Sequence, residues 1–75
     1  DRLAAGLPSV EQLRSDYGLS SAEAEIALNL AAALTPKQIA YDRGASIQTV
    51  RTQIRSLYRK MGVHNQLGLL HSLSH

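Results

Sequence analysis

The chain has 75 residues and no cysteine, which gives one small domain near the lower limit of independent folding and excludes a disulfide framework or a thiolate metal site. It has neither an apolar run of the roughly 18 residues that span a membrane nor a signal-peptide pattern, so a soluble domain is expected. The net charge of +2 is uneven, because residues 1–34 hold two basic and five acidic residues whereas residues 35–75 hold six basic and one acidic. Such a basic half favours polyanionic partners, with a solvated helix surface as the alternative.

Residues 1–18 are expected to form a linker end followed by a short helix. Because the chain begins with Asp1 rather than Met, we expect a fragment of a longer protein. Ser9 is a suitable N-cap, and Gly18 is a suitable end. The apolar residues between them share one helical face: Val10, Leu13 and Tyr17. We favour packing of this helix on the main core over a role as part of a connector from an upstream domain.

A capping box begins the next predicted helix, which runs from Ser20 to about Ala33. The Ser20 hydroxyl can accept from a backbone N–H in the first turn, and the Glu23 carboxylate can reach back to the Ser20 N–H. We interpret Glu23 and Glu25 as cap and surface residues rather than a catalytic pair, because side chains two residues apart on a helix point in different directions. The residues expected to face inward or to allow close packing are Ile26, Ala27, Leu30, Ala31 and either Ala33 or Leu34.

The middle of the chain predicts a short helix, a tight turn and a longer helix. Thr35 and Pro36 suit the N-cap and first position of the short helix, which should extend to about Arg43. Gly44 can take the left-handed conformation that turns the chain, and Ser46 can cap the longer helix. Core positions are expected at Ile39 and Ala40. This order of elements is a helix-turn-helix signature.

The longer helix has two distinct faces when its residues are placed about 100° apart. Its apolar stripe consists of Val50, Ile54, Leu57 and Met61. Its outer face consists of Gln48, Arg51, Thr52, Arg55 and Arg59. A solvent-facing helix usually includes acidic residues for i,i+4 pairing, and this one has none. Nucleic-acid binding is therefore favoured over a merely solvated surface.

The run from Leu19 to about Leu73 resembles the LuxR/GerE-type helix-turn-helix domain, the C-terminal DNA-binding module of many bacterial transcription regulators. The resemblance rests on LSSAEAEI, LTPKQIA and, most specifically, TVRTQIRSLYRKMGV. It implies an all-α tetrahelical helix-turn-helix domain over residues 19–75, preceded by the short extra N-terminal helix. It also implies a cytoplasmic, nucleoid-associated output domain with no chemistry of its own, no cofactor and no membrane association.

In that family the third helix enters the major groove of DNA. The resemblance implies that Arg51, Thr52 and Arg55 face base edges. The planar guanidinium group of arginine can donate hydrogen bonds to O6 and N7 of guanine. Threonine can contact a thymine methyl group or form a hydrogen bond with a base. The residues placed instead for DNA backbone contacts are Lys37, Ser46, Gln48, Thr49, Tyr58, Arg59 and Lys60.

Five positions depart from the family pattern. Ala33 replaces a common glycine, so the turn there is built differently or adopts a positive φ. Arg43 replaces a common leucine and is either directed toward DNA or solvated. Gln66 replaces a common arginine, which removes an expected internal partner for a glutamate of the first domain helix. Gln38 replaces a common glutamate, and Gln53 replaces a common histidine.

The last predicted helix is capped by Asn65 and runs to about Leu73. It is richer in leucine than one core-facing stripe requires. One interpretation is core filling with frayed ends. The other, also implied by the family, is a two-fold dimer contact through Leu67, Leu70 and His71, which would place two reading helices on half-sites about one DNA turn apart.

The expected partners are double-stranded DNA, a second copy of the chain, an upstream sensory or receiver domain, and RNA polymerase. The first rival hypothesis is a helical protein-interaction or dimerisation module whose working surface is the leucine-rich last helix. An enzyme is disfavoured, because the sequence has no nucleophile–base pair, phosphate-binding glycine loop or metal cluster. His71 and His75 have a spacing that suits a metal ion, but fraying at the chain end is favoured, and no metal is expected.

Overall fold

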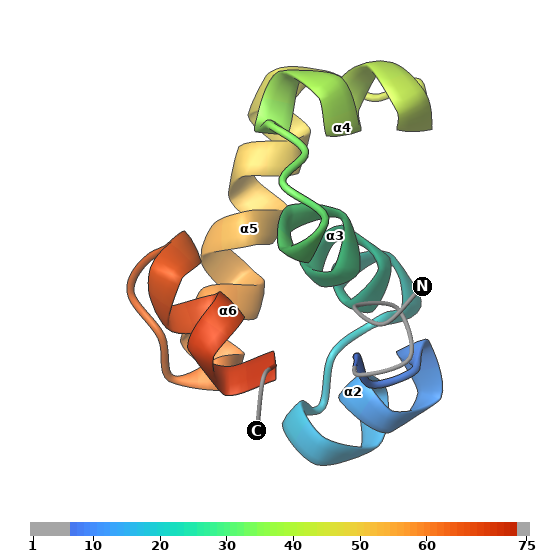
Figure 1. Ribbon diagram of the computed structural model, residues 1–75. Coiled ribbons are helices and arrows are strands. Elements are labelled where there is room, and N and C mark those ends of the chain that lie inside the picture. Colours follow the sequence, from blue (N-terminus) through green and yellow to red (C-terminus); the bar gives the residue numbers. More distant parts are fainter. Residues whose placement is uncertain (1–6, 74–75) are drawn as a thin grey trace.

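The computed structural model describes residues 7–73, which form five α-helices and no strand. In chain order they are α2 (Val10–Tyr17), α3 (Ser21–Ala31), α4 (Pro36–Arg43), α5 (Ile47–Met61) and α6 (Gln66–Leu73), shown in Figure 1. The helix α3 packs against each of the other four, and α4 also packs against α5. The predicted all-α tetrahelical helix-turn-helix domain with an extra N-terminal helix is therefore confirmed.

Short side chains begin all five helices, as predicted. The acceptor residues are Ser9, Ser20, Thr35, Ser46 and Asn65, each bonded to the N–H three residues on at 2.8 to 3.2 Å. The predicted capping box of α3 is present, since Glu23 also accepts from the Ser20 N–H at 2.9 Å. A second capping box occurs at α4, where Gln38 accepts from the Thr35 N–H at 2.9 Å. The glutamine that departs from the family pattern therefore still satisfies this donor.

Glycine ends three helices in the left-handed conformation, with φ of 64° to 71°. The turn after α3 is the exception, because Ala33 takes φ 69° and is the one non-glycine residue with positive φ among residues 7–73. The helix α3 ends at Ala31, two residues before the predicted end at Ala33. Of the two turns expected here, the structure has the one with positive φ, which crowds the alanine Cβ against its own backbone.

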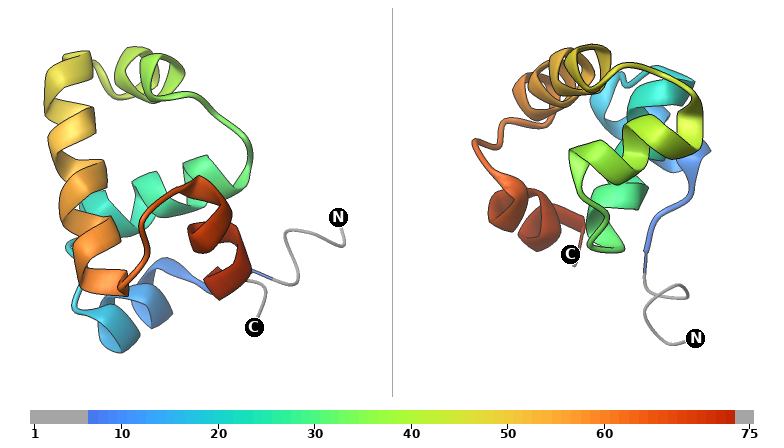
Figure 2. Two further views of the ribbon diagram at one scale, coloured as in Figure 1. Left: turned by 90° about the vertical axis from the view of Figure 1, so that its left-hand side faces the viewer. Right: turned by 90° about the horizontal axis from the view of Figure 1, so that it is seen from above.

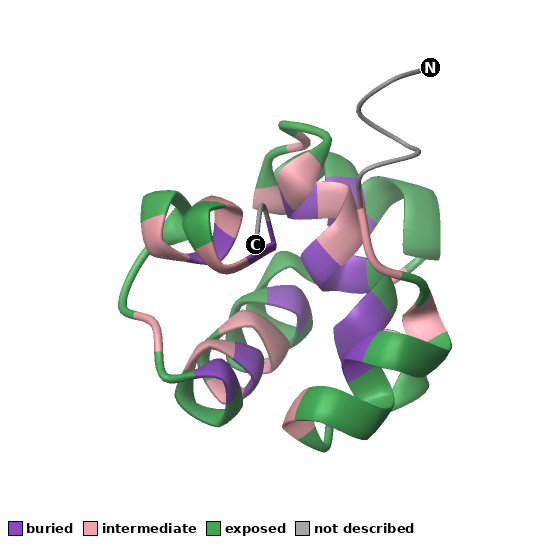
Figure 3. Ribbon diagram, turned by 60° about the horizontal axis from the view of Figure 1, so that its bottom comes forward, coloured by how far each residue is buried: buried purple, intermediate pink, exposed green. Residues whose placement is uncertain are grey.

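Within residues 7–73, thirteen apolar residues form one buried core to which all five helices contribute, and Figure 3 shows the buried positions gathered where the helices face one another. Leu13 belongs to this core, so the predicted packing of α2 is confirmed. The inner stripe of α5 is also confirmed: Val50, Leu57 and Met61 are buried, and Ile54 is half-buried against the core.

The helix-turn-helix consists of α4, the turn at Gly44 and α5. Ile39 and Ala40 are buried, as predicted, so the inner side of α4 is fixed by the core. The Ala45 N–H donates to the Ala40 carbonyl at 2.9 Å, which closes the turn. Figure 2 shows α4 across the first part of α5, with α6 near the other end of α5. The side of α5 away from the core carries exposed residues, among them Arg51, Thr52 and Arg55.

Candidate nucleic-acid interface

The exposed face of α5 is uniformly basic or uncharged. Arg51, Thr52 and Arg55, predicted to face bases, are all exposed. The helix has no acidic residue, and no ion pair within residues 7–73 involves its three arginines. Because Val50 and Leu57 are buried on the opposite side, the direction of this face is fixed by the core. The result is a positively charged face whose direction the core determines.

The Thr52 hydroxyl is engaged within its own helix. Its Oγ1 donates to the Gln48 carbonyl at 3.0 Å. The hydroxyl proton is thereby committed, so the oxygen remains available as an acceptor and the methyl group for apolar contact. The structure thus leaves Thr52 suited to a base-edge donor or a thymine methyl.

The start of α5 presents backbone N–H donors next to the side chain that caps the helix. Ser46 Oγ accepts from the Thr49 N–H at 3.0 Å and shares a hydrogen bond with Thr49 Oγ1 at 2.8 Å. Both side chains and Gln48 are exposed. The first N–H groups of a helix lack intrahelical partners, and the helix dipole favours an anion there. Lys37 is likewise exposed in the first turn of α4.

The last turns of α5 border a shallow groove of about 370 Å³. Its lining residues are Arg55, Tyr58, Arg59, Gly62, Val63 and His64. Arg59 is exposed, whereas Tyr58 is half-buried against the core, and burial raises the pKa of its phenol. His64, which follows the end of the helix, was not among the residues predicted to contact DNA.

Lys60 lies apart from these groups, because it is paired with α3. Its Nζ lies 2.8 Å from Oε1 of Glu23, whose side chain is only 8% exposed. The interpretation of Glu23 as a surface residue is therefore wrong, although its capping role is confirmed. Burial by itself would raise the pKa of the Glu23 carboxyl, but hydrogen bonds from Lys60, the Ser20 backbone and Ser56 outweigh burial and lower it to about 2.

Arg43 makes the second ion pair with α3. Its Nη1 donates to Oε1 of Glu25 at 2.9 Å, with side chains 26% and 53% exposed, respectively. Arg43 is exposed but also paired, so simple solvation is not the full description, and its direction toward DNA stays a prediction. The guanidinium joins the last turn of α4 to α3. The two first-helix glutamates therefore have partners despite Gln66, whose amide donates to the Leu30 carbonyl at 3.0 Å.

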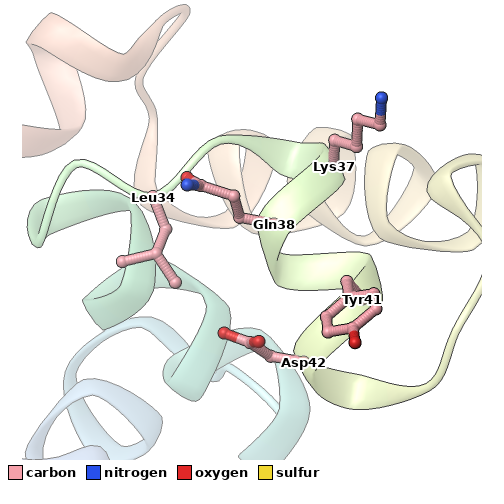
Figure 4. Close-up of a pocket in the computed structure, with 5 residues that line it drawn as sticks. All are labelled: Leu34, Lys37, Gln38, Tyr41 and Asp42. Atoms are coloured by element: carbon pink, nitrogen blue, oxygen red, sulfur yellow. The ribbon is translucent and has the colours of Figure 1, made fainter.

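A groove of about 500 Å³ lies on the outer side of α4, lined by Leu34, Lys37, Gln38, Tyr41 and Asp42. Figure 4 shows Gln38 and Asp42 directed toward Leu34, whereas Lys37 extends away. Tyr41 is 87% exposed. Sequence reasoning missed this groove, although an aromatic residue one position after the core pair of an amphipathic helix signals exposure.

The leucines of α6 divide into two groups. Leu69 and Leu73 are buried in the core, whereas Leu67 is 77% exposed. Of the other residues predicted for dimer contact, Leu70 is half-buried and His71 is exposed. His75 lies outside the described residues, so the pair it would form with His71 is not described. No cluster of three metal-ligating side chains occurs within residues 7–73, and every helix in this range falls short of the length and apolarity needed to cross a bilayer.

A helix-turn-helix whose longer helix exposes an acid-free basic face defines the class of DNA-binding helix-turn-helix domains. The family model of bacterial regulatory proteins of the luxR family matches residues 18–73, and the chain belongs to this family. It is thus a DNA-binding helix-turn-helix domain of transcription regulators, a family of regulators rather than enzymes. Comparisons with curated proteins and with solved structures gave no match.

Proposed function

We propose that α5 enters the major groove of double-stranded DNA and that Arg51, Thr52 and Arg55 read base edges there. The observation that carries this proposal is the exposed, acid-free face of α5, held in one direction by the buried residues behind it. Arg51 and Arg55 are one helical turn apart on that face, so both guanidinium groups can reach neighbouring bases. Each arginine can donate two hydrogen bonds to guanine.

The DNA backbone would be contacted on both sides of the reading residues. Arg59 supplies a charge near the end of α5, and Lys37 supplies one from α4. Around the start of α5, Ser46, Gln48 and Thr49 add polar groups and backbone N–H donors. Lys60 is left out of this set, because Glu23 already neutralises it in the free protein.

Two copies of the domain are proposed to bind DNA together through α6. Leu67 is the main support for this dimer proposal. Its side chain lies on α6 and is 77% exposed, so it offers apolar surface for a two-fold contact. Leu70 and His71 lie on the same short helix. A two-fold arrangement would place two α5 helices on half-sites about 34 Å apart.

In the cell, the domain is proposed to act in the cytoplasm as the output of a longer regulator. Family membership supports an upstream sensory or receiver domain and a functional contact with RNA polymerase. Both are tested by expressing the domain with its native flanking sequence and measuring transcription from a promoter that carries the selected binding site.

The DNA-binding proposal is tested by selecting preferred duplexes from a random pool and then titrating the domain into preferred and mixed-sequence duplexes over a range of salt concentrations. We expect Arg55→Ala to weaken binding to the preferred duplex by about 1 to 3 kcal/mol and to change mixed-sequence binding much less. Equal losses on both duplexes would reassign Arg55 to the backbone. No binding at micromolar protein and low salt would contradict DNA binding and favour a helical protein-interaction module.

A further inference from the structure

The carboxylate of Glu23 joins two helices. Its Oε1 accepts from the Ser20 N–H at 2.9 Å at the start of α3 and from Lys60 Nζ at 2.8 Å in the last turn of α5. The Ser56 side chain, one turn before Lys60, also lowers the pKa of this carboxyl. One nearly inaccessible carboxylate therefore ties the beginning of α3 to the end of the proposed reading helix.

The adjacent basic residues Arg59 and Lys60 of α5 have different surroundings. Arg59 is exposed and borders the groove with Arg55, whereas Lys60 is turned about 100° away along the helix and meets α3. The Lys60 side chain is 40% exposed, so packing around its methylene groups does not stop the ammonium group from extending into solvent. The ion pair with Glu23 keeps the Lys60 ammonium group in place.

Moving Lys60 to a DNA phosphate would leave the Glu23 carboxylate buried without its countercharge. Breaking a buried pair in this way is strongly unfavourable, because the remaining charge is neither solvated nor paired. No other basic side chain is paired with Glu23 within residues 7–73. A phosphate would have to compete with an ion pair that is already formed and whose carboxylate is nearly inaccessible to solvent.

We propose that Glu23 is a positioning residue for DNA recognition, which fixes the last turn of α5 against α3 and withholds Lys60 from the DNA backbone. The domain thereby binds DNA with one fewer phosphate contact, and more of its affinity depends on base contacts. The ratio of preferred to mixed-sequence affinity is raised accordingly. This inference rests on the proposed function of α5 as the reading helix.

The test compares salt dependence in four variants: Arg59→Gln, Lys60→Gln, Glu23→Gln, and the double variant Glu23→Gln with Lys60→Gln. Arg59→Gln should lower the log–log salt slope by about 0.9, the value for one phosphate contact, and Lys60→Gln by less than half of that. Glu23→Gln should steepen the slope by up to about 0.9 and strengthen mixed-sequence binding about eightfold at about 0.1 M salt, because it releases Lys60. The preferred-to-mixed ratio should fall in that variant.

The double variant is the matched control, since it removes the same negative charge but leaves no lysine to release. Its slope should return to that of Lys60→Gln. A Lys60→Gln slope that falls as far as that of Arg59→Gln would overturn the inference, and this comparison stands even if Glu23→Gln fails to fold. Circular dichroism establishes which variants are folded. If the unmodified domain shows no salt-dependent DNA binding, the proposed function fails as well, which distinguishes the two failures.

Discussion

The helix α3 holds the helix-turn-helix at two junctions of similar geometry and opposite environment. At the α3–α5 junction, Glu23 and Lys60 are 2.8 Å apart, and at the α3–α4 junction, Glu25 and Arg43 are 2.9 Å apart. The glutamate side chains are 8% and 53% exposed, respectively. Distance alone would rank these pairs as equals, whereas burial separates them.

The two ion pairs differ in strength because the two glutamates differ in their access to solvent. An exposed pair exchanges good solvation for a modest attraction and typically contributes about 0 to 1 kcal/mol. A buried carboxylate has already lost its solvation, so it depends on every donor around it. Glu23 accepts hydrogen bonds from the Ser20 N–H and from Lys60 Nζ, whereas Glu25 accepts one from Arg43 Nη1. Helix α5 is thus fixed to α3 more firmly at its end than α4 is.

The largest expected effect comes from breaking the buried junction. Glu23→Ala removes the partner of Lys60 and the acceptor of the Ser20 N–H, while the Lys60 ammonium group that remains can reach solvent, and we expect it to lower the free energy of unfolding by about 2 to 3 kcal/mol. Urea denaturation followed by circular dichroism measures this. Glu25→Ala is the matched control, with an expected loss below about 1 kcal/mol. Equal losses in the two variants would contradict the ranking by burial.

Acid should break the same junction without mutation. The pKa of Glu23 is lowered from 4.5 to about 2 in the folded protein, so its contribution is fully present above about pH 5 and is lost as the pH falls toward 2. We expect about 2 to 3 kcal/mol of stability to be lost over this window from this group. The measurement is the difference in unfolding free energy between the unmodified domain and Glu23→Gln, which should shrink as the pH is lowered. A difference independent of pH would show that the carboxylate charge is not what stabilises the junction.

Local features of this fold were predictable from the sequence, because their partners lie within one helical turn. The N-caps and the Ser20–Glu23 capping box depend on a three-residue spacing, and the inner stripe of α5 depends on helical periodicity. The Thr35–Gln38 capping box followed the same rule, so its signal was present in the sequence and was missed. These elements position the candidate interface, which is why its exposed face could be anticipated.

The two junctions were not predictable, because their partners are distant in sequence. Lys60 lies 37 residues from Glu23, and Arg43 lies 18 from Glu25. The family resemblance implied a DNA backbone contact for Lys60 as well as for Arg59. Only the packing of α5 on α3 distinguishes them, by turning one toward a buried carboxylate. The groove beside Tyr41 likewise depends on where Leu34 lies relative to α4.

A smaller effect is expected at the end of α3, away from the buried junction. Ala33 has φ 69°, and glycine reaches this conformation without the steric penalty of a Cβ. Ala33→Gly should raise the free energy of unfolding by about 0.5 to 1 kcal/mol, since the strain relieved exceeds the added freedom of the unfolded chain. Thermal and urea denaturation measure the gain. A loss of stability would show that the turn relies on contacts of the alanine methyl group.

The smallest effect should come from screening the exposed junction with salt. A Debye length of about 10 Å at about 0.1 M shrinks to about 3 Å at 1 M, which weakens pairs that solvent reaches. The coupling energy between Glu25 and Arg43, measured by a double-mutant cycle with alanine, should therefore be below about 0.5 kcal/mol at low salt and vanish at high salt. The same cycle for Glu23 and Lys60 should give a larger coupling that persists, because solvent ions reach the buried carboxylate poorly. If high salt abolished both couplings alike, the two junctions would differ in strength but not in environment, and burial would not be the reason that Lys60 stays with α3.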